Sequence, residues 1–215
     1  MTDQALTNNV TEELLWDPKV DNAAIAVSAD GGEITLRGTV GSFREKQEAK
    51  KDAARVYGVK SVNNELEVRL LDEHRREDPD LRGDVLQAFA LDYLIPASVD
   101  AKVRDRLVTL KGSVDWQYQR EEADFVAANV VGVIDVLDEI KVKAKAKAKA
   151  VKDDIRSAFE RNAALDADGL SVTTSNGTVK IKGAVNSWAE HDEAVSAAWA
   201  APGVTDVDDR ILVEY

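Results

Sequence analysis

The most concentrated charge in the sequence is a run of lysines. Six lysines stand within twelve residues and alternate mostly with alanine: Lys141, Lys143, Lys145, Lys147, Lys149 and Lys152. Such a run can bind an anionic lipid surface, where each lysine contributes about 1 kcal/mol. The alternative, which we favour, is a solvated edge strand and linker whose charges oppose aggregation. Because the run lacks aromatic residues on which bases could stack, it favours lipid over nucleic acid as a ligand.

Acidic residues gather near the end of two segments. They are Asp135, Asp138 and Glu139 in one segment and Asp206, Asp208 and Asp209 in the other. Their carboxylate oxygens could bind a cation, but neither segment has the Asp-x-Asp-x-Asp-Gly loop of an EF-hand. We therefore favour solvated strand starts and predict no metal site.

Two tryptophans, Trp116 and Trp188, stand at the predicted starts of two helices. Because Trp prefers a half-wetted position, these residues could anchor the protein on a membrane surface. We favour the alternative, in which they pack each helix start onto a sheet. Trp16 and Trp199 lie on predicted helix faces, and we expect them in the core or in contacts between domains.

Residues for catalysis are scarce. The chain has no Cys, which excludes disulfides, thiolate metal sites and cysteine nucleophiles. Its two histidines, His74 and His191, lack the spacing of zinc ligands. No P-loop, dinucleotide-binding glycine motif, nucleophile elbow or His-Glu-x-x-His motif is present. We predict a protein that is not an enzyme and uses no cofactor.

Composition and charge narrow the partners further. The 215 residues carry a formal net charge of -12, which repels nucleic acid and anionic lipid except at a local basic patch. No apolar run approaches the roughly 20 residues that a membrane span needs, and no signal peptide is evident at the N-terminus. We expect a cytoplasmic protein, with the periplasm as the alternative for a processed chain.

The elements that would position these residues occur three times along the chain. Gly38, Gly112 and Gly183 stand in the similar stretches ITLRGTV, VTLKGSV and VKIKGAV. Each is followed twenty positions later by a second glycine: Gly58, Gly132 and Gly203. Alanines recur between the glycines at matching positions: Ala49 and Ala53, Ala123 and Ala127, Ala194 and Ala198. A repeat of this kind predicts three copies of one small module.

Each copy predicts the order α-β-β-α-β. Asn176-Gly177 is typical of a tight hairpin turn between two strands. Ser42 and Glu45 predict a capping box at the start of the second helix. The first glycine of each copy is expected to end a strand before this helix, rather than to mark a ligand, and the second to end the helix.

The predicted fold class is therefore α+β, with three tandem modules at residues 1–71, 80–143 and 149–215. Each module has a three-stranded sheet with two helices on one face, because strands that alternate apolar and polar residues need a cover on one side. The order of the strands within each sheet stays open.

These motifs resemble the BON domain, named for bacterial osmotically induced and nodulation proteins. The family pattern of an apolar strand, V-x-L-x-G-x-V, an Ala-bearing helix and G-V-x-x-V-x-[ND] is matched by VTLKGSV and GVIDVLDEIKV. The last polar position is occupied by Asn64, Asp138 and Asp209 in the three copies. The resemblance covers nearly the whole chain. It implies a non-enzymatic binding module of the bacterial envelope or stress response, usually linked to phospholipid surfaces and often exported to the periplasm.

Two functions follow as expectations. The first is association with a phospholipid or membrane surface in an osmotic-stress response, through the lysine run and the exposed helix starts, with three tethered modules adding avidity. The alternative is a cytoplasmic protein that senses a cation or acts as a scaffold for another protein.

Overall fold

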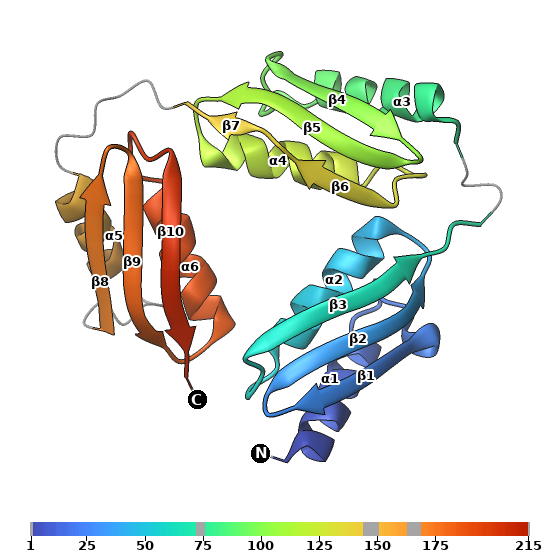
Figure 1. Ribbon diagram of the computed structural model, residues 1–215, viewed down its shortest axis with the longest axis horizontal. Helices are drawn as coiled ribbons and strands as arrows, with labels where there is room; N and C mark the ends of the chain where they lie inside the picture. Colours follow the sequence, from blue (N-terminus) through green and yellow to red (C-terminus); the bar gives the residue numbers. More distant parts are fainter. Residues whose placement is uncertain (1, 72–75, 144–150, 163–168, 215) are drawn as a thin grey trace. The chain divides into compact units, whose positions relative to one another are not determined.

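The structure is a computed structural model that describes residues 2–71, 76–143, 151–162 and 169–214. It contains three modules of the predicted α-β-β-α-β order (Figure 1). Among the described residues, no helix is both long and apolar enough to cross a membrane.

The first module contains two helices, a short 3-10 helix and three strands. They are α1 (Asp3–Trp16), the 3-10 helix η1 (Asn22–Ala24), β1 (Ile25–Asp30), β2 (Glu33–Val40), α2 (Phe43–Arg55) and β3 (Ser61–Val68). The central strand β2 pairs antiparallel with β1 and parallel with β3. The antiparallel hairpin is therefore followed by a crossover through α2, which settles the strand order that the sequence left open.

The second and third modules repeat this order. The second contains α3 (Asp78–Leu91), β4 (Val99–Arg104), β5 (Leu107–Val114), α4 (Gln117–Ala128), β6 (Asp135–Asp138) and β7 (Lys141–Val142). The third contains α5 (Val151–Arg161), β8 (Leu170–Ser175), β9 (Thr178–Val185), α6 (Trp188–Trp199) and β10 (Asp206–Val213). In the second module the last strand is interrupted, and both β6 and β7 pair parallel with β5.

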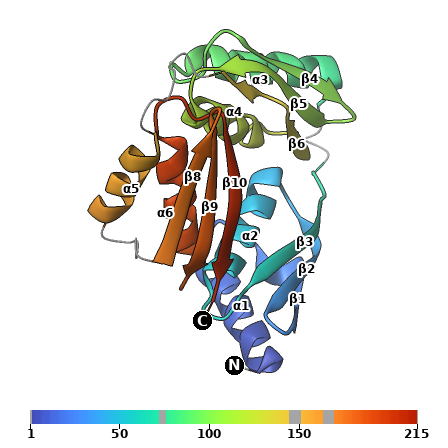
Figure 2. The same cartoon turned by 60° about the vertical axis from the view of Figure 1, so that its left-hand side comes forward.

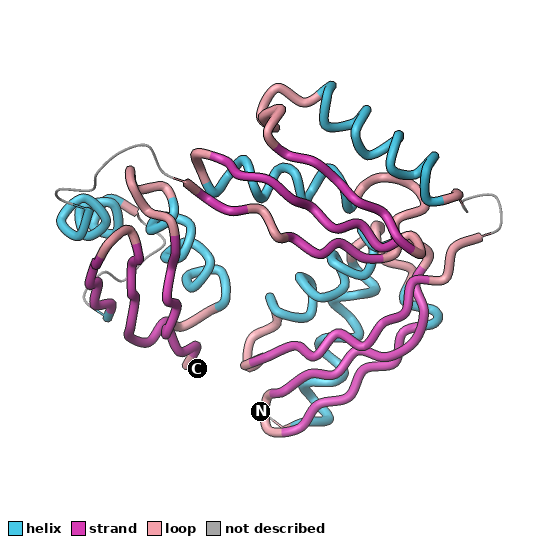
Figure 3. Tube along the Cα trace, turned by 45° about the horizontal axis from the view of Figure 1, so that its top comes forward, coloured by secondary structure: helices cyan, strands magenta, loops and turns pink. Residues whose placement is uncertain are grey.

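The helices of each module lie on one face of its sheet, as the fold class predicts; Figure 2 shows α5 and α6 on one side of β8, β9 and β10, and Figure 3 separates helices from strands by colour. In the first module, Leu6, Val10 and Leu14 follow the helical spacing of α1 and are buried against the sheet. Ala49 and Ala53 of α2 are fully buried. Their small side chains let α2 approach the sheet closely.

Side chains at the helix starts hold the hairpin turns. In the second module, the Asp78 carboxylate accepts hydrogen bonds from the backbone N–H groups of Asp105 (2.8 Å) and Arg106 (2.9 Å). Both turn residues have positive φ angles, 51° and 64°. In the first module, the Asp3 carboxylate accepts a hydrogen bond from the Gly31 N–H over 3.1 Å. The first helix of each of these modules therefore starts beside the hairpin turn that its sheet requires.

The sequence suggested that the first repeated glycine of each module ends a strand. This prediction is wrong. Gly38 lies within β2, with a φ of 129°, and pairs with Ile25 of β1. A Cβ atom at this position would overlap the carbonyl oxygen of Ala24. Gly112 and Gly183 meet Ser98 and Gly169 in the same way. The glycine is needed because the neighbouring chain enters the sheet against its backbone.

The full capping box forms in the first and third modules, and the second module keeps only part of it. The Glu45 N–H donates a hydrogen bond to the Ser42 hydroxyl over 3.1 Å, and the Glu45 carboxylate accepts one from the Gly41 N–H over 2.8 Å. Ser187 and Glu190 repeat both bonds in the third module. In the second module Trp116 replaces the capping serine, and the backbone N–H of Trp116 donates a hydrogen bond to the Gln119 side chain. Trp116 and Trp188 are therefore not at equivalent positions: counted from the first repeated glycine of its module, Trp116 lies one position earlier than Trp188.

Candidate functional site

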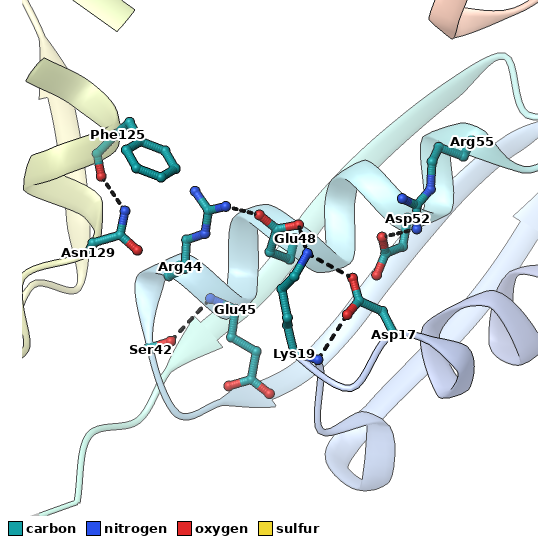
Figure 4. A network of polar contacts seen from close by, with 10 residues as sticks. All are labelled: Asp17, Lys19, Ser42, Arg44, Glu45, Glu48, Asp52, Arg55, Phe125 and Asn129. Carbon is teal, nitrogen blue, oxygen red and sulfur yellow. Dashed lines mark hydrogen bonds and ion pairs between the residues drawn. The ribbon is translucent and has the colours of Figure 1, made fainter. Parts of the chain in front are cut away.

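A buried acidic cluster in the first module is the most unusual polar feature of the described residues. Glu48 and Asp52 lie one turn apart on α2 and share a face of that helix. Asp17, the residue that ends α1, comes to the same place (Figure 4). All three side chains are buried, and one oxygen of each carboxylate lies within 4.8 Å of an oxygen of each of the others. We call Asp17, Glu48 and Asp52 the acidic cluster.

Three basic side chains surround the acidic cluster. The Lys19 ammonium lies 3.5 Å from one oxygen of Asp17 and 3.5 Å from one oxygen of Glu48. Arg44 pairs with the other Glu48 oxygen, one turn away on α2. Arg55 contacts Asp52 at 2.5 Å and Glu13 of α1 at 3.0 Å. The network therefore links the C-terminal end of α1 to side chains along α2.

The environments of the three acids differ. The backbone N–H of Lys19 donates a hydrogen bond to Asp17 Oδ1 over 2.9 Å, and this bond lowers the pKa of the Asp17 carboxyl. Burial raises the pKa of Asp52 to about 6; the Arg55 charge opposes this shift, while the neighbouring acids add to it. Asp52 Oδ2 is buried and has no hydrogen-bond partner. The cluster therefore holds one carboxylate oxygen that a cation or a proton would satisfy.

The corresponding positions of the other modules show what the fold itself requires. Counted from the first repeated glycine, Glu48 corresponds to Glu122 and Glu193, whereas Asp52 corresponds to Val126 and Ala197. The residue after the first helix is Asp17, Asp92 or Asn162. The glutamate thus recurs, but the third acid occurs in the first module alone. The acid at Asp52, where the other copies have Val126 and Ala197, is the signal of the cluster in the sequence, and the sequence analysis missed it.

The predicted lysine surface is only partly described. Lys141 on β7 and Lys143 just after it are exposed. Lys145, Lys147 and Lys149 lie outside the residues that the structure describes. A role of this segment in binding stays a prediction.

The four tryptophans differ in how far they are buried, and not all of them lie where the sequence predicted. Trp188 is half-buried and meets the His191 ring edge-on, with ring centroids 4.8 Å apart, whereas Trp116 is partly exposed. Trp199 packs against the core of the third module. Of the two positions expected for Trp16, a core or a contact between domains, the core is wrong, because 84% of the residue is exposed in the last turn of α1. It follows the buried Leu14 by two positions, so the helix turns it away from the sheet.

Three of the six acids that the sequence analysis considered for a cation site form contacts with neighbouring basic side chains. Asp208 contacts Lys180 at 3.2 Å and Arg210 at 2.9 Å. Asp209 contacts the His191 ring at 2.8 Å, and Glu139 contacts Lys111 at 3.0 Å. Over the described parts of the chain, acids gather as a group of three at Asp17, Glu48 and Asp52, and not at these strand ends.

Exposed apolar side chains recur at the end of the first helix in two modules. Leu15 and Trp16 end α1, whereas Leu91 ends α3 and Tyr93 lies two residues beyond it. Their exposed fractions range from 69% to 93%. Trp16 also borders an open hollow of about 430 Å³ with Tyr57, at the end of α2. Two modules therefore offer similar apolar tips.

The repeat architecture has matches among known proteins. A comparison with protein families matches the BON domain to residues 2–69, 77–144 and 147–215. The chain belongs to the BON domain family. As a BON protein it is 32% identical over 148 residues to the osmotically-inducible protein Y of Escherichia coli, covering 66% of this chain and 74% of that one.

Similarity of this BON protein to solved structures is weaker. It matches CdsD, described as a structural protein of the type III secretion system of Chlamydia trachomatis, with 13% identity and a TM-score of 0.27. That match covers 98% of this chain and 92% of the other, and a second structure, of the CdsD C-terminal domain, has the same identity and score. Scores this low carry no conclusion about arrangement or function.

Proposed function

We propose that this protein is a non-enzymatic binding protein that associates peripherally with phospholipid surfaces during an osmotic-stress response. The family membership and the name of the Escherichia coli relative support the stress response. The predicted location, the cytoplasm or, for a processed chain, the periplasm, stays a prediction.

The observation that carries the proposal is the pair of apolar tips. Trp16 is 84% exposed and follows the exposed Leu15 at the end of α1, and Tyr93 is 93% exposed two residues after the exposed Leu91 that ends α3. Trp and Tyr have an apolar body and a polar edge, and they are enriched where a bilayer meets water. Two tips on one chain would bind one surface together and increase the affinity by avidity.

Electrostatics supplies the second contribution. The net charge of -12 repels an anionic membrane, so attraction must come from a local basic segment. Lys141 and Lys143 are exposed at the start of the lysine run, which continues through Lys149. Because exposed charges are screened beyond about 8 Å at physiological ionic strength, this contribution should fall as salt rises.

Co-sedimentation with vesicles tests the proposal. The full chain is mixed with zwitterionic and with anionic vesicles at low and at high salt. It is compared with a tip variant (Leu15→Gln, Trp16→Gln, Leu91→Gln, Tyr93→Gln) and a lysine variant in which Lys141, Lys143, Lys145, Lys147 and Lys149 become Gln. All four tip residues are exposed, so these changes should leave the fold intact.

We expect the tip variant to lose binding to both kinds of vesicle. The lysine variant should lose about tenfold or more in binding to anionic vesicles at low salt, and little at high salt. Absence of wild-type binding to any vesicle would contradict the proposal and favour another protein as the partner.

A further inference from the structure

The acidic cluster of the first module has the features of an ion site. Each of its carboxylates uses one oxygen for a firm contact: Asp17 with the Lys19 N–H, Glu48 with Arg44 and Asp52 with Arg55. The second oxygens are less well satisfied. Those of Asp17 and Glu48 share the Lys19 ammonium, and that of Asp52 has no hydrogen-bond partner. Three carboxylates thus converge, and their basic neighbours leave one buried oxygen, Asp52 Oδ2, without a hydrogen bond.

Lys19 is a weak occupant of this site. Its ammonium lies 3.5 Å from both oxygens, whereas a charge-assisted hydrogen bond is typically about 2.7–2.9 Å long. Its side chain is 62% exposed, so the ammonium can turn into water, which would leave the buried Asp17 and Glu48 oxygens to another cation. Lys19 therefore covers the mouth of the cluster without closing it.

Asp52 gives independent support for a ligand. Its side chain is fully buried, and a buried carboxylate oxygen without a partner is costly. The fold does not require an acid here, since the other modules place Val126 and Ala197 at this position. A residue that costs stability and is absent from the sister modules points to a role in binding.

The spacing of the oxygens suits calcium. Ca²⁺ binds carboxylate oxygens at about 2.3–2.6 Å, so two oxygens on opposite sides of the ion are about 4.8 Å apart. The three acids offer oxygens within 4.8 Å of one another. Ca²⁺ also accepts irregular coordination completed by water, which the exposed mouth at Lys19 can supply. Mg²⁺ is smaller and holds its own water more firmly.

We propose that Asp17, Glu48 and Asp52 bind one Ca²⁺ ion and that the ion displaces the Lys19 ammonium. Bound calcium would join the end of α1 to α2 and stabilise the first module by mass action. None of its three acids belongs to the apolar tips or to the lysine run, although Asp17 directly follows Trp16 in the sequence.

The test is calorimetric titration of the EDTA-treated full chain with CaCl₂ at constant ionic strength, without lipid. The thermal unfolding midpoint is followed in parallel. MgCl₂ and KCl are titrated as competing ions. Because no vesicles are present, the result is independent of the proposed lipid binding.

Two variants and a control make the test specific. Asp52→Val introduces the residue of the second module and should lower calcium affinity by tenfold or more while the circular dichroism spectrum stays native. Lys19→Gln removes the competing ammonium and should raise the affinity by about threefold or more. Glu160→Gln, an exposed acid of α5, should change nothing.

Calcium heats and a midpoint increase in the wild type, lost in Asp52→Val and strengthened in Lys19→Gln, would support the site. The proposal would be overturned by equal calcium binding in Asp52→Val and the wild type. Absence of binding in both the wild type and Lys19→Gln would overturn it as well.

Discussion

Asn162 donates a hydrogen bond from its side-chain amide to the Glu193 carboxylate over 3.0 Å. This bond joins the residue after α5 to the recurring glutamate of α6. In the first module, the same two positions hold two carboxylates, Asp17 and Glu48, with Lys19 between them. One fold thus uses a neutral junction in the third module and a charged one in the first.

The first module should accept the neutral pair of the third module in place of its own charged pair. Asp17→Asn lets the new amide donate to Glu48 and keeps an oxygen for the Lys19 N–H. We expect a change in the unfolding free energy of the first module within about 0.5 kcal/mol, against a loss of about 1–2 kcal/mol for Asp17→Ala, because the alanine leaves that N–H unpaired. Hydrogen exchange of β2 amides measures both without interference from the other modules. Equal losses in the two variants would contradict this interpretation.

Asp52→Val should stabilise the first module in the absence of calcium, by about 1 kcal/mol at pH 7. The reason is that Asp52 is buried with one oxygen unsatisfied, while Arg55 is half-exposed and keeps Glu13 as a partner. A destabilised variant at pH 7 would show that the Arg55 contact outweighs the burial of the acid.

The same variant should depend on pH in a defined direction. Burial raises the pKa of Asp52 from 3.8 to about 6, so the folded state binds this proton more tightly than the unfolded state. The contribution of Asp52 to the stability of the wild type therefore falls as the pH rises from about 4 to about 6. The advantage of Asp52→Val should be largest above pH 6 and shrink at pH 4, which denaturation at several pH values measures. An advantage that is constant over this range would contradict the assigned pKa.

His191 of the third module provides a second pH dependence, of the same sign but in a higher pH range. Hydrogen bonding to Asp192 and the charge and hydrogen bond of Asp209 raise its pKa above 6.5, although burial acts the other way. The stability that this gives is fully present below pH 6.5 and is lost as the pH rises through the folded-state pKa. NMR titration of the ring should show a lower pKa in Asp192→Asn and in Asp209→Asn, and no change in Asp30→Asn. Unchanged values in the first two variants would remove these contacts from the account.

Two glycine substitutions should act in opposite directions. Gly38→Ala places a Cβ against the Ala24 carbonyl at a φ of 129° and should cost about 2 kcal/mol or more. Gly83 lies within α3 with open space where its Cβ would be, so Gly83→Ala should stabilise its module by about 0.5–1 kcal/mol. Thermal unfolding of the two variants checks the pair. A tolerated Gly38→Ala would mean that the entering chain can shift.

The fold was predictable from the sequence because its signals are local and occur three times. The turn at Asn176-Gly177 and the capping pair Ser42 and Glu45 each specify a conformation on their own, and the repeat multiplies the evidence. The reason for Gly38 was missed because the carbonyl that crowds it comes from before β1 and is invisible in the strand pattern. Trp16 lies outside the core because it follows the buried Leu14 of α1 by two positions and so leaves the buried face of that helix.

The acidic cluster was harder to predict, since it depends on the approach of Asp17 to α2. Glu48 and Asp52 alone look like the charged face of a surface helix. Their burial follows from the way α1 ends against α2, which is a tertiary contact. The contrast of Asp52 with Val126 and Ala197 was the available signal.

Trp16 itself reports most directly on the central claim of membrane association. A variant that keeps Trp16 and has Phe at Trp116, Trp188 and Trp199 is mixed with vesicles that contain brominated phospholipid. The account predicts a blue shift of the Trp16 emission and quenching by the bromine atoms. Emission that stays at the wavelength of a fully hydrated indole, without quenching, at lipid concentrations that saturate wild-type co-sedimentation would contradict it.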